Sequence, residues 1–160
     1  MGSAKILERI IEWIGGSVLA VVTLITILQV FFRYVLKMPL IWSEELSRFL
    51  FIWTVWFGAI LGIAQGKHFA IQFIRDRFPS PWPQRVKIIT DLLALAFLAV
   101  LAISGVSLVK ITSQEFYVTF PVSVKYAYMA SVVGGVLMFF FLTLDLRSTF
   151  RSLSRKEKKS

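Results

Sequence analysis

Three charged residues stand directly before a long apolar run, in the stretch "PLIWSEELSRFLFIW" at residues 39–53. Glu44 and Arg48 are four residues apart with the acid first, so on a helix they can form an ion pair. Glu44 and Glu45 would lie in the first turn, where negative charge meets the positive end of the helix dipole, and Ser43 would be the N-cap. This chemistry is ion pairing and anchoring, not catalysis.

Neither a catalytic site nor a cofactor site is indicated. The 160 residues include no cysteine, which excludes disulfides, zinc–thiolate sites and iron–sulfur clusters. The single histidine, His68, excludes a haem held by two histidines of this chain. No nucleophile stands with a base, and no metal cluster or phosphate loop is visible, so we expect no enzyme and no cofactor. For His68, which follows Gly66 and Lys67, we expect a capping or interfacial role; the alternative is proton coupling, since histidine titrates near neutral pH.

The composition indicates an integral membrane protein. Hydrophobic residues make up 57% of the chain and charged residues 17%, against about 45–50% and about 25% in ordinary soluble domains. The apolar residues are also gathered in long blocks. The net charge of +9 is concentrated beside these blocks, which is typical of flanks that meet anionic membrane phospholipid and argues against nucleic-acid binding.

Four apolar blocks are long enough to cross a bilayer, which takes about 20 residues. They predict an all-α fold with a single membrane domain, residues 1–160, and spans at about 13–32, 46–64, 88–109 and 126–144. The first block is longer than the ~7–15 apolar residues of a cleavable signal, and no A-x-A site follows it.

The basic residues predict the orientation of these spans. Of the 18 lysines and arginines, 13 fall on the side that carries both termini and the middle loop, and five fall on the other side. The positive-inside rule therefore places both termini in the cytoplasm, with a basic tail at 147–160. The charged turn of Glu44 and Glu45 then faces the outside.

The middle loop, "HFAIQFIRDRFPSPWP", carries spaced aromatic residues among basic ones. Read as a helix over 68–78, it is short and amphipathic, and it suits the cytoplasmic interface until Pro79 ends it. The alternative is a partly buried loop. The interfacial residues of the predicted in-plane helix are His68, Phe69, Phe73 and Phe78.

Small residues recur every four positions in two of the predicted spans. Gly58 and Gly62 form one row, and a second row consists of Ala127, Ser131 and Gly135. Such rows let helices approach closely in lipid. Both rows therefore predict helix packing, either within the chain or against another chain.

The second span is short for a bilayer. Its uninterrupted apolar run, 49–64, is about 24 Å long, against about 30 Å of hydrocarbon. Arg48 is therefore drawn toward the hydrocarbon and needs a partner, and Arg33 can reach the same acidic pair. Trp42 lies where interfacial aromatic belts lie. Two interpretations stay open, a clasp between helices of this chain or a contact with another subunit.

Charged residues are absent from the middle of every predicted span, and no span is broken by a mid-helix proline. Transport sites usually keep ionisable groups or broken helices there. A four-helix drug/proton exchanger is a rival interpretation, but that class relies on a glutamate inside the first span. Here Glu12 precedes the apolar run. We therefore expect a scaffold.

The ordered pattern over residues 30–74 resembles the small, DctQ-like membrane subunit of tripartite ATP-independent periplasmic (TRAP) transporters. The similarity beyond it is looser, at Pro121 and Tyr126. The resemblance supports an interface or clasp made of Arg33, Tyr34, Trp42, Glu44, Glu45 and Arg48. The matching positions are Arg33, Tyr34, Pro39, Trp42, Glu44, Glu45, Arg48, Trp53, Gly58 and His68.

This resemblance implies a multi-pass protein of the bacterial inner membrane with no sodium or solute site of its own. The implied partners are a large multi-span TRAP subunit, which carries a carboxylate solute inward by a sodium-driven elevator movement, and a periplasmic solute-binding protein. Sialic acid and C4-dicarboxylates are the solute classes that fit. A stand-alone small transporter and an assembly subunit of another membrane complex are the alternatives.

Overall fold

The computed structural model describes residues 2–65 and 82–157, which are mostly helical. Within these residues, four helices are long and apolar enough to cross a membrane, which confirms the prediction of an all-α fold with four helices of spanning length. The predicted in-plane helix at 68–78, with His68, Phe69, Phe73 and Phe78, lies outside the described residues. The helices are α1 (Gly2–Tyr34), α2 (Ile41–Ala64), α4 (Trp82–Ile111), the short 3₁₀ helix η1 (Thr112–Gln114) and α5 (Lys125–Glu157).

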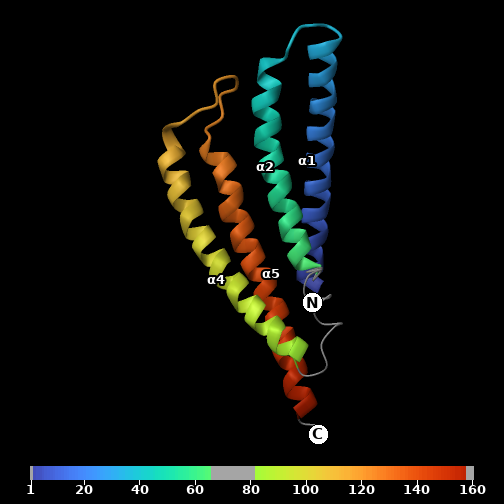
Figure 1. Cartoon of the computed structure of the whole chain (residues 1–160), viewed down its shortest axis with the longest axis vertical. Helices are drawn as coiled ribbons and strands as arrows, with labels where there is room; N and C mark the ends of the chain where they lie inside the picture. The colour runs from blue at the N-terminus through green and yellow to red at the C-terminus, as the bar shows by residue number, and fades with distance from the viewer. Residues whose placement is uncertain (1, 66–81, 158–160) are drawn as a thin grey trace.

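The long helices stand in an open row in the order α1, α2, α5, α4 (Figure 1). α1 packs on α2, α2 packs on α5, and α5 packs on α4. The start of α1 and the end of α5 lie at one end of the long axis of the molecule (Figure 1). The α1–α2 turn and the α4–α5 loop lie toward the other end (Figure 1). This arrangement agrees with both termini on one side of the membrane. That this side is the cytoplasm stays a prediction from the basic residues.

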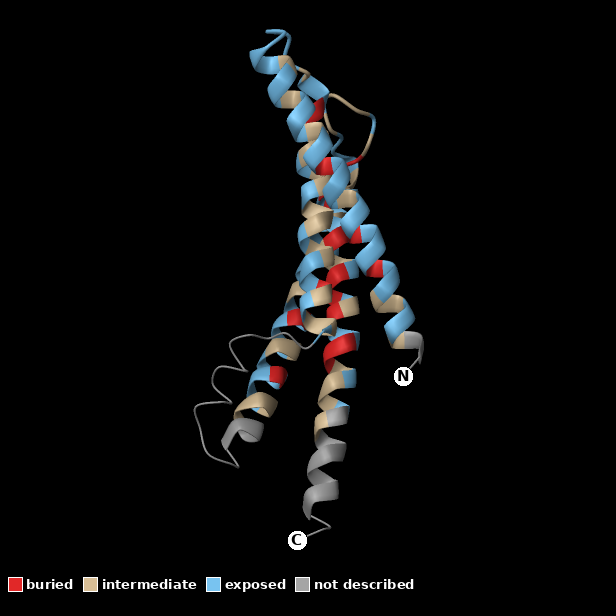
Figure 2. Ribbon diagram, turned by 90° about the vertical axis from the view of Figure 1, so that its right-hand side faces the viewer, coloured by how far each residue is buried: buried red, intermediate tan, exposed pale blue. Residues whose placement is uncertain are grey.

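Burial is confined to a narrow seam between neighbouring helices (Figure 2). α5 has a neighbour on each side, and 39% of its most apolar stretch is buried, against 6–11% in the other three helices. Most apolar side chains therefore face outward, toward lipid or another protein. The core of the seam contains Ile11 of α1, Ile60 of α2, Leu98 of α4, and Met138, Phe141 and Leu142 of α5.

Glycine allows the helices to meet closely at two points in the seam. A Cβ on Gly134 of α5 would collide with the Trp56 ring of α2. A Cβ on Gly105 of α4 would lie only 2.7 Å from the Ser131 hydroxyl of α5. A side chain at either position would therefore push two helices apart, because close packing in lipid depends on small residues.

The two predicted small-residue rows have different surroundings. Gly135 of α5 faces Ala102 of α4, and Ala127 is buried, so their row lies in the seam. Gly58 and Gly62 of α2 are exposed, and a Cβ on either would meet nothing within 4 Å. Only the α5 row therefore packs within this chain.

α2 begins earlier than the sequence predicts, at Ile41. Its N-cap is Leu40, which provides no side-chain hydrogen bond. Ser43 lies inside the first turn, where its buried hydroxyl donates to the Leu40 carbonyl at 2.6 Å. The predicted N-cap role of Ser43 is therefore wrong, because its hydroxyl is used to bond backward along the chain.

Candidate subunit interface

Glu45 joins α2 to the loop between η1 and α5. Its carboxylate accepts the backbone N–H of Thr119 at 2.8 Å and that of Val118 at 3.4 Å. It also accepts a hydrogen bond from the Thr119 hydroxyl. Hydrogen bonds to an ionised acceptor are stronger than those between neutral groups. Glu45 therefore clasps two parts of the chain that are 74 residues apart, and we call this contact the Glu45 clasp.

The loop that carries these donors is a short, closed turn. Phe116 and Ser123 form an antiparallel bridge across it. The Tyr117 N–H donates to the Val122 carbonyl at 3.1 Å. At the tip, the rings of Tyr117 and Phe120 stack with their centroids 4.7 Å apart. The donors are thus held in place by the loop's own contacts.

An aromatic contact lies beside the Glu45 clasp. Phe49, one turn further along α2, packs edge-on against the rings of Tyr117 and Phe120, at centroid distances of 6.1 and 6.3 Å. Burial raises the pKa of the Tyr117 phenol, and the neighbouring Tyr128 adds to the shift. The Tyr117 ring lies on the apolar side of the contact.

Glu44 and Arg48 pair with each other at the surface. Arg48 Nη2 lies 3.4 Å from Glu44 Oε1, and the two side chains are 67% and 69% exposed respectively. Within the described residues, Arg33 forms no ion pair with Glu44 or Glu45. The structure thus places the residues of the charged turn in different surroundings. Glu45 is bound within the chain, whereas the Glu44–Arg48 pair faces outward.

The other predicted interface residues lie at the same end of the molecule, at the α1–α2 turn. Tyr34 is 72% exposed and Trp42 is 46% exposed. Arg33, in the last turn of α1, is exposed as well. The turn therefore presents aromatic, apolar and basic side chains together, and its other exposed apolar residues are Val35, Leu36, Met38 and Ile41.

One face of α2 continues along the helix from the exposed ion pair. Phe51 and Val55 on this face are 57% and 52% exposed. The helix makes its internal contacts elsewhere, through Phe57 against Gly15 of α1 and Trp56 against α5. The exposed face carries charged side chains at one end, bulky apolar side chains in the middle and small residues at the other end. We call it the α2 open face: Glu44, Arg48, Phe51, Val55, Gly58, Ala59 and Gly62.

A second clasp, which was not predicted from the sequence, joins α4 to α5 near the end where the termini lie. Lys87 Nζ is 3.0 Å from Asp91 Oδ2 and 2.6 Å from Asp145 Oδ2. It also donates to the Thr149 hydroxyl at 2.9 Å. Asp91 is only 2% exposed. The signal for this Lys87 clasp was the four-residue spacing of Lys87 and Asp91, with Asp91 one turn inside a predicted span.

Neither clasp offers a set of metal ligands. Over residues 2–65 and 82–157, no group of three His, Cys, Asp or Glu side chains could hold a metal ion. Each clasp instead satisfies its charges with groups from another helix or loop, so its chemistry is the fixing of one element against another.

A protein-family model matches residues 22–152, which is most of the chain, and its description is the DctQ component of tripartite ATP-independent periplasmic transporters. The chain belongs to this family. The matched range includes both clasps and the α2 open face of this DctQ component, and it begins at Val22, past the middle of α1.

Several relatives of this DctQ component are similar over most of its length. A Haemophilus influenzae protein that carries the name TRAP transporter small permease protein is 27% identical over 156 residues, which cover 98% of this chain and 97% of the relative. The sialic acid TRAP transporter small permease protein SiaQ of Vibrio cholerae is 26% identical over 136 residues, 85% of this chain and 79% of the relative.

A third relative is much longer. The sialic acid TRAP transporter permease protein SiaT of Haemophilus influenzae is 26% identical over 136 residues, which cover 85% of this chain but 22% of SiaT. The family and the four helices of spanning length make this chain a multi-pass TRAP small permease subunit.

Proposed function

We propose that this subunit is a scaffold for the large membrane subunit of a sodium-driven TRAP transporter in the bacterial inner membrane. The solute is a carboxylate of the sialic acid or C4-dicarboxylate class, delivered by a periplasmic binding protein. The large subunit moves the solute inward by an elevator movement, and this chain holds the fixed part of the large subunit. The observation that carries the proposal is the open row of a DctQ-family chain, which leaves most apolar side chains exposed.

The use of charge supports a scaffold. The Lys87 clasp lies toward the end of the molecule that carries the termini, and the Glu45 clasp lies toward the opposite end. Both clasps connect elements of the chain. Solute and ion pathways, by contrast, use ionisable groups or broken helices within the membrane. Charges that fix helix ends suit a support that does not itself move solute.

The α2 open face is the proposed contact with the large subunit. Gly58 and Gly62 allow a partner helix to approach the backbone of α2. The Glu44–Arg48 pair gives the same face a charged end that a partner can match. The relative SiaT supports a large permease as the partner. The segment of SiaT that is similar to this chain makes up 22% of SiaT, so the rest of that permease protein has no counterpart in this chain.

The end that carries the α1–α2 turn is the proposed periplasmic end, where the binding protein would dock. Arg33, Tyr34 and Trp42 are exposed there, beside the loop of the Glu45 clasp. Recognition of the solute belongs, in this proposal, to the other two subunits. The names of SiaT and SiaQ favour sialic acid as the solute class.

The test is co-purification followed by reconstitution. The tagged chain is extracted in mild detergent from its native membrane, and the mass of any companion is measured. A companion of many spans in a near one-to-one ratio is expected, and vesicles that contain the pair should take up solute with the binding protein and an inward sodium gradient. Recovery only as a monomer or self-oligomer, with neighbouring proteins expressed, would favour a stand-alone transporter.

A further inference from the structure

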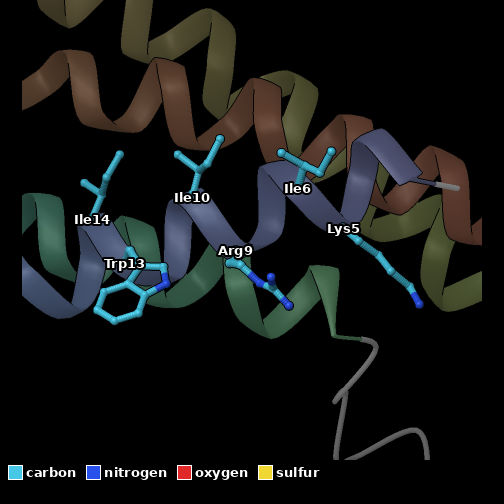
Figure 3. A pocket seen from close by; sticks show the side chains of 6 residues that line it. All are labelled: Lys5, Ile6, Arg9, Ile10, Trp13 and Ile14. Atoms are coloured by element: carbon cyan, nitrogen blue, oxygen red, sulfur yellow. The ribbon is translucent and has the colours of Figure 1, made fainter.

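The first turns of α1 carry a groove of about 490 Å³. Its lining falls into two rows of residues four apart along the helix. Figure 3 shows that the two rows project to different sides of α1. One row combines two cations with an aromatic ring and the other is aliphatic, so the groove is amphipathic. The rows are Lys5, Arg9 and Trp13, and Ile6, Ile10 and Ile14.

This groove lies on the side of α1 that faces away from the seam. Leu7 and Ile11 take part in the core contacts of α1, and Gly15 continues this side against α2. On the groove side, Trp13 is 73% exposed and Ile6 is 63% exposed. The described helices of this chain therefore leave the groove open.

The two cations of the groove stand one helical turn apart. Like charges at this spacing repel each other. Within the described residues, neither Lys5 nor Arg9 forms an ion pair. Figure 3 shows both side chains extending to the same side of α1. An anion bound between them would relieve the repulsion.

The length of α1 places these cations at the depth of the lipid headgroups. α1 has 33 residues and is therefore about 50 Å long, longer than the about 40–45 Å bilayer including its headgroups. The rise from Lys5 to Trp13 is about 12 Å. The cations then lie among headgroups while the aliphatic row reaches toward the acyl chains, and Trp13 lies at the boundary that tryptophan prefers.

We infer that this groove binds one anionic phospholipid of the phosphatidylglycerol type. The phosphate lies between the Lys5 ammonium and the Arg9 guanidinium, and an acyl chain follows the aliphatic row. The predicted cytoplasmic leaflet supplies such lipids, whereas a protein partner would have to provide acidic residues and bury them with both cations. The inference goes beyond the proposed function, since these residues precede the family match at residue 22.

Native mass spectrometry of the purified chain tests the inference, with phosphatidylglycerol and phosphatidylcholine titrated separately. We expect a single phosphatidylglycerol adduct that forms at lower lipid concentration than the phosphatidylcholine adduct. The Lys5→Gln/Arg9→Gln variant should bind phosphatidylglycerol about thirtyfold more weakly, which corresponds to about 1 kcal/mol for each basic side chain. The matched variant Lys37→Gln/Lys110→Gln removes the same charge at the other end and should bind like the wild type.

Two further measurements test whether the bound molecule is a phospholipid. Ile10→Ala keeps both cations and shortens the aliphatic row, so it should weaken phosphatidylglycerol binding by less than the double variant does. Glycerol phosphate should not compete, because it lacks an acyl chain. Equal binding of the two lipids, an unchanged affinity in the Lys5→Gln/Arg9→Gln variant, or full competition by glycerol phosphate would overturn the inference. Loss of the adduct when the large subunit is present would show that protein covers the groove, and it would overturn the inference as well.

Discussion

Glu45 Oε2 on α2 lies 2.8 Å from the backbone nitrogen of Thr119, in the loop that precedes α5. The aromatic contact of Phe49 lies beside it. These two contacts fix the α4–α5 loop against α2, toward the end of the molecule that lies away from the termini. The position of that loop therefore depends on one carboxylate and on the aromatic contact beside it.

Glu45→Ala should lower the midpoint of thermal unfolding more than Thr119→Val. Alanine removes the acceptor of two backbone N–H groups and a hydroxyl, whereas valine removes only the hydroxyl. The measurement is thermal unfolding of the purified chain in detergent. Identical midpoints for the wild type and both variants would contradict the clasp.

Glu45→Ala and Arg48→Ala should each lower uptake by weakening assembly, without changing the preference among solutes. Arg48→Ala should change the stability of the isolated chain by less than about 0.5 kcal/mol, because exposed i,i+4 ion pairs contribute little. The yield of co-purified large subunit and the uptake of the reconstituted complex measure the effect. Full uptake with an intact complex in both variants would show that the charged turn is not part of the interface.

Gly58→Leu should reduce the amount of large subunit that co-purifies while the isolated chain stays folded. Gly58 has open space around it, so leucine fits in the isolated chain and obstructs only a partner on the α2 open face. Leu93→Phe, on an exposed position of α4, is the control for added bulk and should co-purify normally. A wild-type yield with Gly58→Leu would place the interface elsewhere, while the scaffold function would still stand.

Gly134→Ala should destabilise the chain by about 1–3 kcal/mol, the usual cost of overpacking. The added methyl group would collide with Trp56, which belongs to the α2–α5 contact. Gly16→Ala is the matched control, because a Cβ there meets nothing within 4 Å. Denaturation of both variants in detergent compares them, and equal stabilities would mean that Trp56 moves aside without cost.

Lys87→Met should destabilise the α4–α5 pair by about 2–3 kcal/mol. Breaking a buried ion pair costs about 3–5 kcal/mol, and the lower figure reflects the partial exposure of Lys87 and Asp145, 25% and 44%. The double variant Lys87→Met/Asp91→Leu should recover part of the loss, since it removes the buried charge that lacks its cation. No recovery in the double variant would mean that Asp91 does not cause the loss.

The four spans were predictable from the sequence because a bilayer demands long apolar helices, and length alone reveals them. Which face of a helix meets its neighbour was predictable only in part, because helices in lipid are apolar all round and only the small-residue row of α5 marked a packing face of this chain. Gly58 and Gly134 are the same residue type in similar apolar surroundings, yet one is exposed and the other meets Trp56. The partner of Glu45 was also not predictable, since Thr119 is 74 residues away along the chain.

α5 occupies an inner position of the row although it follows the other three long helices in the sequence. Before it is inserted, the α1–α2 pair and α4 share no extensive contact and behave as two separate pieces in the membrane. Its insertion joins them, because it brings the core residues Met138, Phe141 and Leu142 together with the α5 side of the Lys87 clasp. Synthesis that stops before residue 125 would therefore leave fragments with exposed seams, which are natural substrates for membrane proteases.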